Sequence, residues 1–177
     1  MSKIAVLIDD LFEDVEYTKP TKAYKNAGHE IIHLGLKQGK EVKGKKQGTM
    51  VEIDSSIEDS NAEDFDALFI PGGYSPDKLR AKKEPVNFVK DFVKSKKPVF
   101  IICHGAQLLI TAKMLKDRKV TGWKSIKVDI ENAGAEYVNQ EVVVDNNIIS
   151  SRSPGDLSAF INETLEKINF DRRKICQ

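Results

Sequence analysis

The side chains best suited to chemistry are a neighbouring thiol and imidazole, Cys103 and His104, which come directly after the apolar run 99–102. Apolar residues with helical spacing follow between Leu108 and Leu115. A polar pair between a strand and a helix is typical of a nucleophile elbow. The N-terminus of that helix favours the thiolate, so we expect a lowered pKa for the Cys103 thiol. The alternative is that Cys103 is a small buried core residue, as free cysteines often are.

Two further strand ends carry residues suited to a site. Five carboxylates lie between Asp9 and Glu16, after the first apolar strand. Like charges so close raise one another's pKa, so we expect most of them to be solvated or to cap the next helix. The strand at 67–70 ends in Pro71-Gly72-Gly73, and paired glycines let the backbone approach a ligand and direct N–H groups at an anion. The alternative for these glycines is an ordinary tight turn.

Several other chemistries do not fit the sequence. A phosphoacceptor receiver needs an aspartate at the end of its third strand, where this chain has Pro71. A glutamine amidotransferase takes a histidine from beyond its nucleophile, and no histidine follows His104. No GxGxxG pattern is present, which argues against a dinucleotide. His29 and His33 fall before or within a predicted strand and support a metal site only weakly. We therefore predict no cofactor and no metal.

Alternating apolar strands and amphipathic helices place these strand ends in an α/β fold. Short apolar runs predict strands at 4–8, 30–36, 67–70 and 99–102. Helical spacing predicts helices at 20–28, with Pro20 in the first turn, and at 86–93, 108–115, 123–133 and 157–168. The stretch 37–54 predicts a hairpin excursion, and 141–151 predicts a second hairpin. This order indicates a doubly wound, mainly parallel sheet sandwiched by helices (flavodoxin-like), with a small antiparallel hairpin excursion. Ligands bind such sheets beyond the carboxyl ends of the strands, where all three candidate segments lie.

Composition and length limit the partners, the number of domains and the compartment that the sequence predicts. The 177 residues carry 28 Lys+Arg against 27 Asp+Glu, a net charge of +1, which argues against a nucleic-acid partner. The five lysines between 37 and 46 are expected to form a solvated face. The length fits one domain, which we place at 1–170, followed by a charged C-terminal tail at 171–177. The chain shows no signal peptide and no apolar stretch long enough to cross a membrane. Its two cysteines, Cys103 and Cys176, do not suggest a disulfide framework, so we expect a cytoplasmic protein.

Six segments, in order, resemble the ThiJ/PfpI superfamily, and the last three resemble its PfpI branch of intracellular proteases and deglycases. They are Phe12-Glu13-Asp14, Ile70-Pro71-Gly72-Gly73, Ile102-Cys103-His104-Gly105, Asn132-Ala133-Gly134-Ala135, Val142-Val143-Val144-Asp145 and Ser151-Arg152-Ser153-Pro154-Gly155-Asp156-Leu157. The resemblance covers about residues 4–165.

The resemblance implies a role for each residue of the site. It implies that Cys103 is the nucleophile and that His104 is the base. Glu13 matches the glutamate that reaches the cysteine sulfur, and a carboxyl held beside a thiolate should be protonated. Gly73 and the backbone N–H of His104 match the oxyanion-hole donors. Asp77 stands where protease-like members have a glutamate that orients the histidine of a neighbouring subunit, and its side chain is shorter.

The elbow and the resemblance together favour a Cys103-dependent hydrolase. Its substrates would be glycated protein adducts or small 2-oxoaldehydes, with weak peptide hydrolysis as a side activity, in a stress-protection role. The resemblance also implies a homodimer or a larger ring. One alternative is a non-enzymatic redox sensor or holdase chaperone that uses oxidation of Cys103. Another is a non-catalytic binding module with Cys103 in its core.

Overall fold

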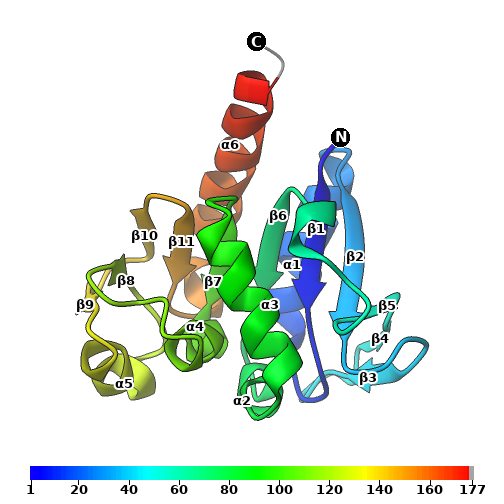
Figure 1. Ribbon diagram of the computed structural model, residues 1–177, viewed down its shortest axis with the longest axis horizontal. Helices are drawn as coiled ribbons and strands as arrows, with labels where there is room; N and C mark the ends of the chain where they lie inside the picture. The colour runs from blue at the N-terminus through cyan, green and yellow to red at the C-terminus, as the bar shows by residue number, and fades with distance from the viewer. Residues whose placement is uncertain (176–177) are drawn as a thin grey trace.

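The structure, a computed structural model, describes residues 1–175, with side chains through residue 170. Across these residues the chain forms a seven-stranded sheet in the order β10-β11-β7-β6-β1-β2-β5 (Figure 1). Every neighbouring pair is parallel except β10 and β11. The strands are β1 Lys3–Leu7, β2 Glu30–Gly35, β5 Ser55–Ser56, β6 Ala67–Ile70, β7 Val99–Ile102, β10 Val142–Asp145 and β11 Ile148–Ser151. The predicted doubly wound, mainly parallel sheet is confirmed.

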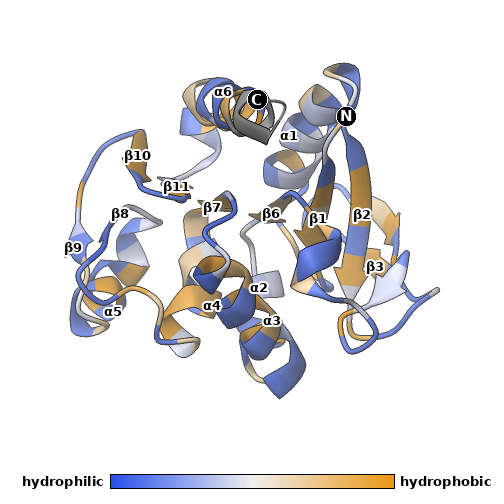
Figure 2. Ribbon diagram, turned by 45° about the horizontal axis from the view of Figure 1, so that its top comes forward, coloured by the Kyte–Doolittle hydropathy of each residue, from blue (hydrophilic) through white to orange (hydrophobic). Residues whose placement is uncertain are grey.

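Helices cover both faces of the sheet, because its central strands are apolar on both sides. In β1, Ala5 and Leu7 pack into one core, whereas Ile4 and Val6 pack into the other. Helices α2, α3 and α4 cover the first core, and α1 and α6 cover the second (Figure 2). The helices are α1 Asp14–Asn26, α2 Ser75–Arg80, α3 Lys83–Lys94, α4 Ala106–Thr111, α5 Lys127–Asn132 and α6 Leu157–Ile175.

The first helix differs from the prediction in a way that matters for the site. It begins at Asp14 rather than at Pro20, so Pro20 lies inside α1. The helix starts early because the Glu13 carbonyl accepts the N–H groups of Glu16 and Tyr17, which forms a complete turn ahead of the proline. Residues 14–16 therefore belong to a helix that begins at the carboxyl end of β1.

Several shorter elements lie outside the seven-stranded sheet. The predicted hairpin excursion is present as β3 Glu41–Lys43 and β4 Met50–Glu52, which pair antiparallel. A short parallel pair, β8 Lys119–Val120 and β9 Glu136–Tyr137, was not predicted, nor was helix α2. The helix predicted at 123–133 is shorter, since a 3₁₀ turn at Lys124–Ile126 precedes α5. Further 3₁₀ turns span Ala62–Asp64, Cys103–Gly105 and Pro154–Asp156.

The strand order reverses between β1 and β6, because the chain runs from β1 outward to β2 and then returns to the other side of β1. Ligand sites in such sheets lie at the carboxyl ends of the strands beside this reversal. The segments that leave β1, β6 and β7 there are the three that the sequence singles out.

The C-terminal end of the chain is helical over the described residues. Helix α6 runs to Ile175 and so crosses the predicted boundary at residue 170. That boundary between domain and tail stays a prediction, and Cys176 lies outside the described residues. In the part of the chain that the structure describes, no helix has both the length and the apolar character that crossing a membrane requires.

Candidate active site

Cys103 lies in the sharp turn that joins β7 to α4. Its backbone has φ +58°, in the left-handed region that residues other than glycine rarely adopt. The turn is tight enough that a Cβ on Gly105 would lie 2.8 Å from the Ile70 carbonyl oxygen of the neighbouring strand. Such backbone strain persists only where the surrounding structure holds the residue in place, and it is frequent at functional sites. The Cys103 side chain is buried, with 9% of the residue exposed.

This turn brings the imidazole of His104 to the thiol. Cys103 Sγ lies 3.2 Å from His104 Nδ1, although adjacent residues on a strand would point to opposite faces. His104 Nε2 lies 3.4 Å from the Ser125 hydroxyl, so both ring nitrogens have a partner. Burial lowers the pKa of His104 and so does Lys45, while Asp77 opposes them. These effects favour a neutral imidazole, which can accept a proton.

Backbone N–H groups from two strand ends meet the thiol. Those of His104 and Gly73 both hydrogen-bond the Cys103 sulfur. Gly73 is held there by an antiparallel bridge to Phe12, with φ +80°. A Cβ at Gly73 would lie 2.5 Å from backbone atoms of Leu11 and Glu13, so only glycine fits. The two donors that the resemblance assigns to an oxyanion hole thus converge on one point.

The carboxyl group beside the thiol belongs to Glu16, whereas the resemblance assigned this contact to Glu13. Glu16 is fully buried on the first turn of α1, and its Oε2 accepts the Gly72 N–H at 3.0 Å. Glu16 also hydrogen-bonds Cys103, and a Cβ on Gly72 would collide with both side chains. The contact predicted for Glu13 is therefore wrong by one helical turn.

Glu13 instead forms ion pairs above the site. Its Oε2 lies 2.8 Å from Lys45 Nζ and its Oε1 lies 3.3 Å from Lys46 Nζ. Both lysines come from the turn between β3 and β4. Lys45 and Lys46 are both exposed, as predicted for the lysines of this stretch, but their ammonium groups also pair with Glu13 beside the site.

Glu16 and Cys103 act as one buried acidic pair. Burial raises the pKa of Glu16 to about 7, and the charge of Glu13 adds to the effect. Burial and Glu16 likewise raise the pKa of the Cys103 thiol, against the N–H groups of His104 and Gly73. The expectation of a lowered thiol pKa is therefore wrong, because desolvation and a neighbouring carboxyl outweigh the end of a short helix. Two negative charges so close repel each other, so the pair carries a single negative charge just above neutral pH.

Asp77 lies at the edge of this arrangement. It is exposed on the first turn of α2 and affects His104 through its charge. The hydroxyl of Ser125, rather than a carboxylate, is within reach of His104 Nε2 in this chain. A role for Asp77 across a subunit interface stays a prediction.

Glu16, Lys45 and Ser125 are not among the residues that the sequence predicted for the site. Glu16 could have been found from the acidic run, since a helix that starts at Asp14 puts Glu16 in its first turn, close to the glycines after β6. Lys45 reaches the site from a hairpin, and Ser125 reaches it from the 3₁₀ turn before α5. The positions of both segments depend on long-range packing, for which their local sequence gives no signal.

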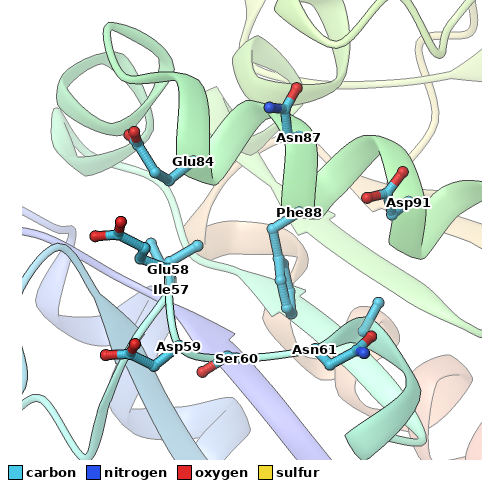
Figure 3. Close-up of a pocket in the computed structure, with 10 residues that line it drawn as sticks. Ile57, Glu58, Asp59, Ser60, Asn61, Glu84, Asn87, Phe88 and Asp91 are labelled. Atoms are coloured by element: carbon cyan, nitrogen blue, oxygen red, sulfur yellow. The ribbon is translucent and has the colours of Figure 1, made fainter.

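A separate hollow lies between α3 and the segment 57–62 (Figure 3). Its rim carries the carboxylates of Glu58, Asp59, Glu84 and Asp91, and the Phe88 ring extends from α3 toward the facing segment. The residues that line it include no thiol and no histidine. Within the described residues, no cluster of three or more histidine, cysteine or acidic side chains could hold a metal ion.

The chain is similar to known proteins over most of its length. "Putative cysteine protease YraA" of Bacillus subtilis is 56% identical over 163 residues, which cover 92% of this chain and 96% of that protein. "Protein/nucleic acid deglycase 2" of Escherichia coli is 53% identical over 164 residues, 92% of this chain and 95% of that protein.

A solved structure from Anabaena variabilis, a two-domain protein with DJ-1/ThiJ/PfpI-like and ferritin-like domains, superposes with a TM-score of 0.93 at 38% identity. The superposition covers 96% of this chain but only 48% of that longer chain. The model of the DJ-1/PfpI family matches residues 2–167. Together with the elbow at Cys103, these similarities establish that the chain belongs to the DJ-1/PfpI family.

Proposed function

We propose that this chain is a cysteine-dependent hydrolase that acts on small 2-oxoaldehydes or on the adducts that they form with proteins. The observation that carries the proposal is the Cys103 sulfur, held in a left-handed elbow against the backbone N–H groups of Gly73 and His104. A nucleophile beside two fixed N–H donors is the arrangement that carbonyl addition needs. The deglycase name of the Escherichia coli relative supports the aldehyde class of substrate.

The chemistry begins with addition of the Cys103 sulfur to the aldehyde carbon as the thiol proton passes to the Glu16 carboxylate beside it. The C=O electron pair moves to the oxygen, which takes over the N–H groups of Gly73 and His104 as hydrogen-bond donors. His104 then removes the proton on that carbon and returns it to the neighbouring carbonyl carbon, which leaves a thioester on Cys103. Water cleaves the thioester to a 2-hydroxy acid and regenerates the thiol. The sum is aldehyde plus water, with no external oxidant or reductant.

The Glu16 carboxyl supports this step by holding the second proton of the acidic pair. When the negative charge lies on sulfur, the protonated carboxyl donates a hydrogen bond to it. When the sulfur is bonded to carbon and uncharged, the Glu16 carboxyl can ionise. Glu16 thus keeps the sum of the charges on Cys103 and Glu16 at one negative charge throughout the reaction.

Peptide hydrolysis is proposed as a weak side activity. Amide cleavage requires a well-oriented histidine that can protonate the leaving amine. In this chain His104 Nε2 faces the Ser125 hydroxyl at 3.4 Å, and the Asp77 carboxylate is not its hydrogen-bond partner. The protease name of the Bacillus subtilis relative is the support for this activity.

The test is turnover of methylglyoxal, followed by loss of the dicarbonyl and by appearance of lactate. We expect Cys103→Ala to lose activity about a hundredfold or more, as removal of a nucleophile does. Cys176→Ala is the matched control and should retain wild-type turnover. Equal rates for wild type and Cys103→Ala would refute the proposal.

A second candidate function is a redox sensor or holdase, favoured by the same N–H groups, which could bind the oxygens of an oxidised Cys103. It predicts a mass gain of one or two oxygens on the peptide that contains Cys103 after peroxide treatment, together with suppressed aggregation of a client protein. Oxidation restricted to the Cys176 peptide would exclude it.

We also propose that the protein works in the cytoplasm as a homodimer or a larger ring, as the resemblance implies. Light scattering on the eluting protein tests this, because the chain mass is 19.8 kDa. A single species at the monomer mass over micromolar concentrations would contradict it.

A further inference from the structure

The Lys45 side chain crosses the mouth of the candidate active site. Its Nζ lies 2.8 Å from Glu13 Oε2 and 5.3 Å from the centre of the Tyr74 ring, which follows Gly73. Burial opposes its charge, but Glu13, Cys103 and Glu16 together raise the pKa of Lys45. The ammonium group therefore stays charged and lies within electrostatic reach of both reacting groups.

The loop that presents Lys45 is fixed rather than free. The Lys45 N–H donates to the Phe12 carbonyl at 3.0 Å, and the Leu11 N–H donates to the Lys43 carbonyl at 2.7 Å. The fully buried Asp14 carboxylate accepts the next backbone N–H groups of the loop at 2.9, 3.2 and 3.0 Å, those of Lys46, Gln47 and Thr49. The position of Lys45 over the site is thus built into the start of α1.

The positive charges at the mouth lie outside the buried negative charge. Lys45 and Lys46 contribute two positive charges, and both pair with the single carboxylate of Glu13. Glu13 compensates one of these charges, and the other faces the single negative charge of the Cys103–Glu16 pair, which is buried behind it. Lys45 is the inner of the two, with a side chain 27% exposed against 67% for Lys46.

We propose that Lys45 is a specificity-determining residue that selects electrophiles carrying a carboxylate close to the reactive carbon. The carboxylate would bind the Lys45 ammonium while the carbonyl oxygen occupies the N–H groups of Gly73 and His104. Among the 2-oxoaldehydes of the proposed function, this favours those that carry a carboxylate beyond the dicarbonyl group over neutral ones of similar size. The substrate class rests on the proposed function, whereas the charge preference of the Cys103 thiol does not.

Two alkylating reagents of the same size test the charge preference without any turnover. Iodoacetate carries a carboxylate beside its reactive carbon, whereas iodoacetamide carries a neutral amide. The same thiolate displaces iodide from both reagents. The ratio of their rates at Cys103, followed by peptide mass spectrometry, therefore cancels any change in thiol pKa or nucleophilicity. A purely structural effect of a substitution would lower both rates and leave the ratio unchanged.

We expect Lys45→Met to lower the iodoacetate-to-iodoacetamide ratio about five- to tenfold, a typical effect of one partly exposed charge. Lys46→Met is the matched control and should change it less than about twofold, because its ammonium is more solvated. Lys45→Arg should retain the wild-type ratio. Raising salt from about 0.02 to 0.5 M should lower the wild-type ratio toward that of Lys45→Met, since ions screen the attraction.

A ratio unchanged in Lys45→Met, or lowered equally in Lys46→Met, would overturn the inference. If Lys45→Met does not fold, the salt dependence of the wild-type ratio decides in its place, and a ratio that salt does not change would overturn the inference. A charge preference without methylglyoxal turnover would contradict the proposed function and leave this inference unaffected. Methylglyoxal turnover by a site without a charge preference would support the proposed function and overturn the inference about Lys45.

Discussion

Replacing Asp14 with asparagine tests whether the start of α1 positions the β3–β4 loop. The Asp14 carboxylate is fully buried, and both of its oxygens accept N–H groups of the loop. Asparagine keeps one oxygen and turns an NH₂ group toward the remaining N–H donors, so one or two charge-assisted hydrogen bonds are lost. At about 1.5–3 kcal/mol for each bond to a charged group, we expect a loss of about 2–4 kcal/mol in the free energy of unfolding.

Urea unfolding at pH 7 measures this loss, and Asp129→Asn on the exposed side of α5 is the control, expected to change stability by less than about 0.5 kcal/mol. Burial opposes ionisation of Asp14, but the loop N–H groups outweigh it and hold the pKa of its carboxyl well below the usual range. A lowered pKa stabilises the fold above about pH 4 and loses that contribution as the pH falls toward the folded-state pKa. The difference in the free energy of unfolding between wild type and Asp14→Asn should therefore become smaller at acid pH. A loss below about 1 kcal/mol at pH 7, or a difference that does not change with pH, would refute the reasoning.

Three further predictions concern the site and the core. Glu16→Gln removes a carboxyl whose pKa of about 7 lies above its ordinary 4.5, so ionising it costs stability as the pH rises. In urea unfolding, the free energy of unfolding of the variant minus that of wild type should therefore rise by about 3 kcal/mol between pH 4.5 and 8. A difference that does not change with pH would contradict this. Gly73→Ala should destabilise by about 3 kcal/mol or more in thermal unfolding, because its Cβ meets backbone at 2.5 Å, whereas Gly28→Ala, with equal φ and open space, should cost only about 1 kcal/mol. Tyr24→Phe removes a buried 2.9 Å hydrogen bond to Thr164 and should lower the free energy of unfolding by about 1 kcal/mol in thermal unfolding. A loss near zero would contradict this prediction.

Much of the fold could be predicted because its strands are buried on both faces. The runs at 67–70 and 99–102 are apolar without interruption, and their ends match β6 and β7 residue for residue. The helix predicted from Pro20 starts too late, because proline is typical of a first helical turn, whereas α1 carries this proline in its interior. The local hydrogen bonds to the Glu13 carbonyl decide where that helix begins, and no periodicity in the sequence reports them.

The site was predictable where backbone geometry alone defines it. Cys103, His104 and Gly73 occupy strand ends, and the sheet order brings those ends together. Side chains that reach the site from other elements were not predictable in the same way. Glu16 depended on the start of α1, and Lys45 depended on a hairpin fixed by a buried aspartate far away in the sequence.

The left-handed backbone at Cys103 also limits which nucleophiles evolution could install at this position. A side chain without a branch at Cβ, such as serine, can occupy φ +58° at the same steric cost as cysteine. Threonine cannot, since its branched Cβ crowds the carbonyl groups in that region. Exchange of sulfur for oxygen at this position therefore needs one substitution, whereas a threonine nucleophile requires a different backbone conformation at the turn.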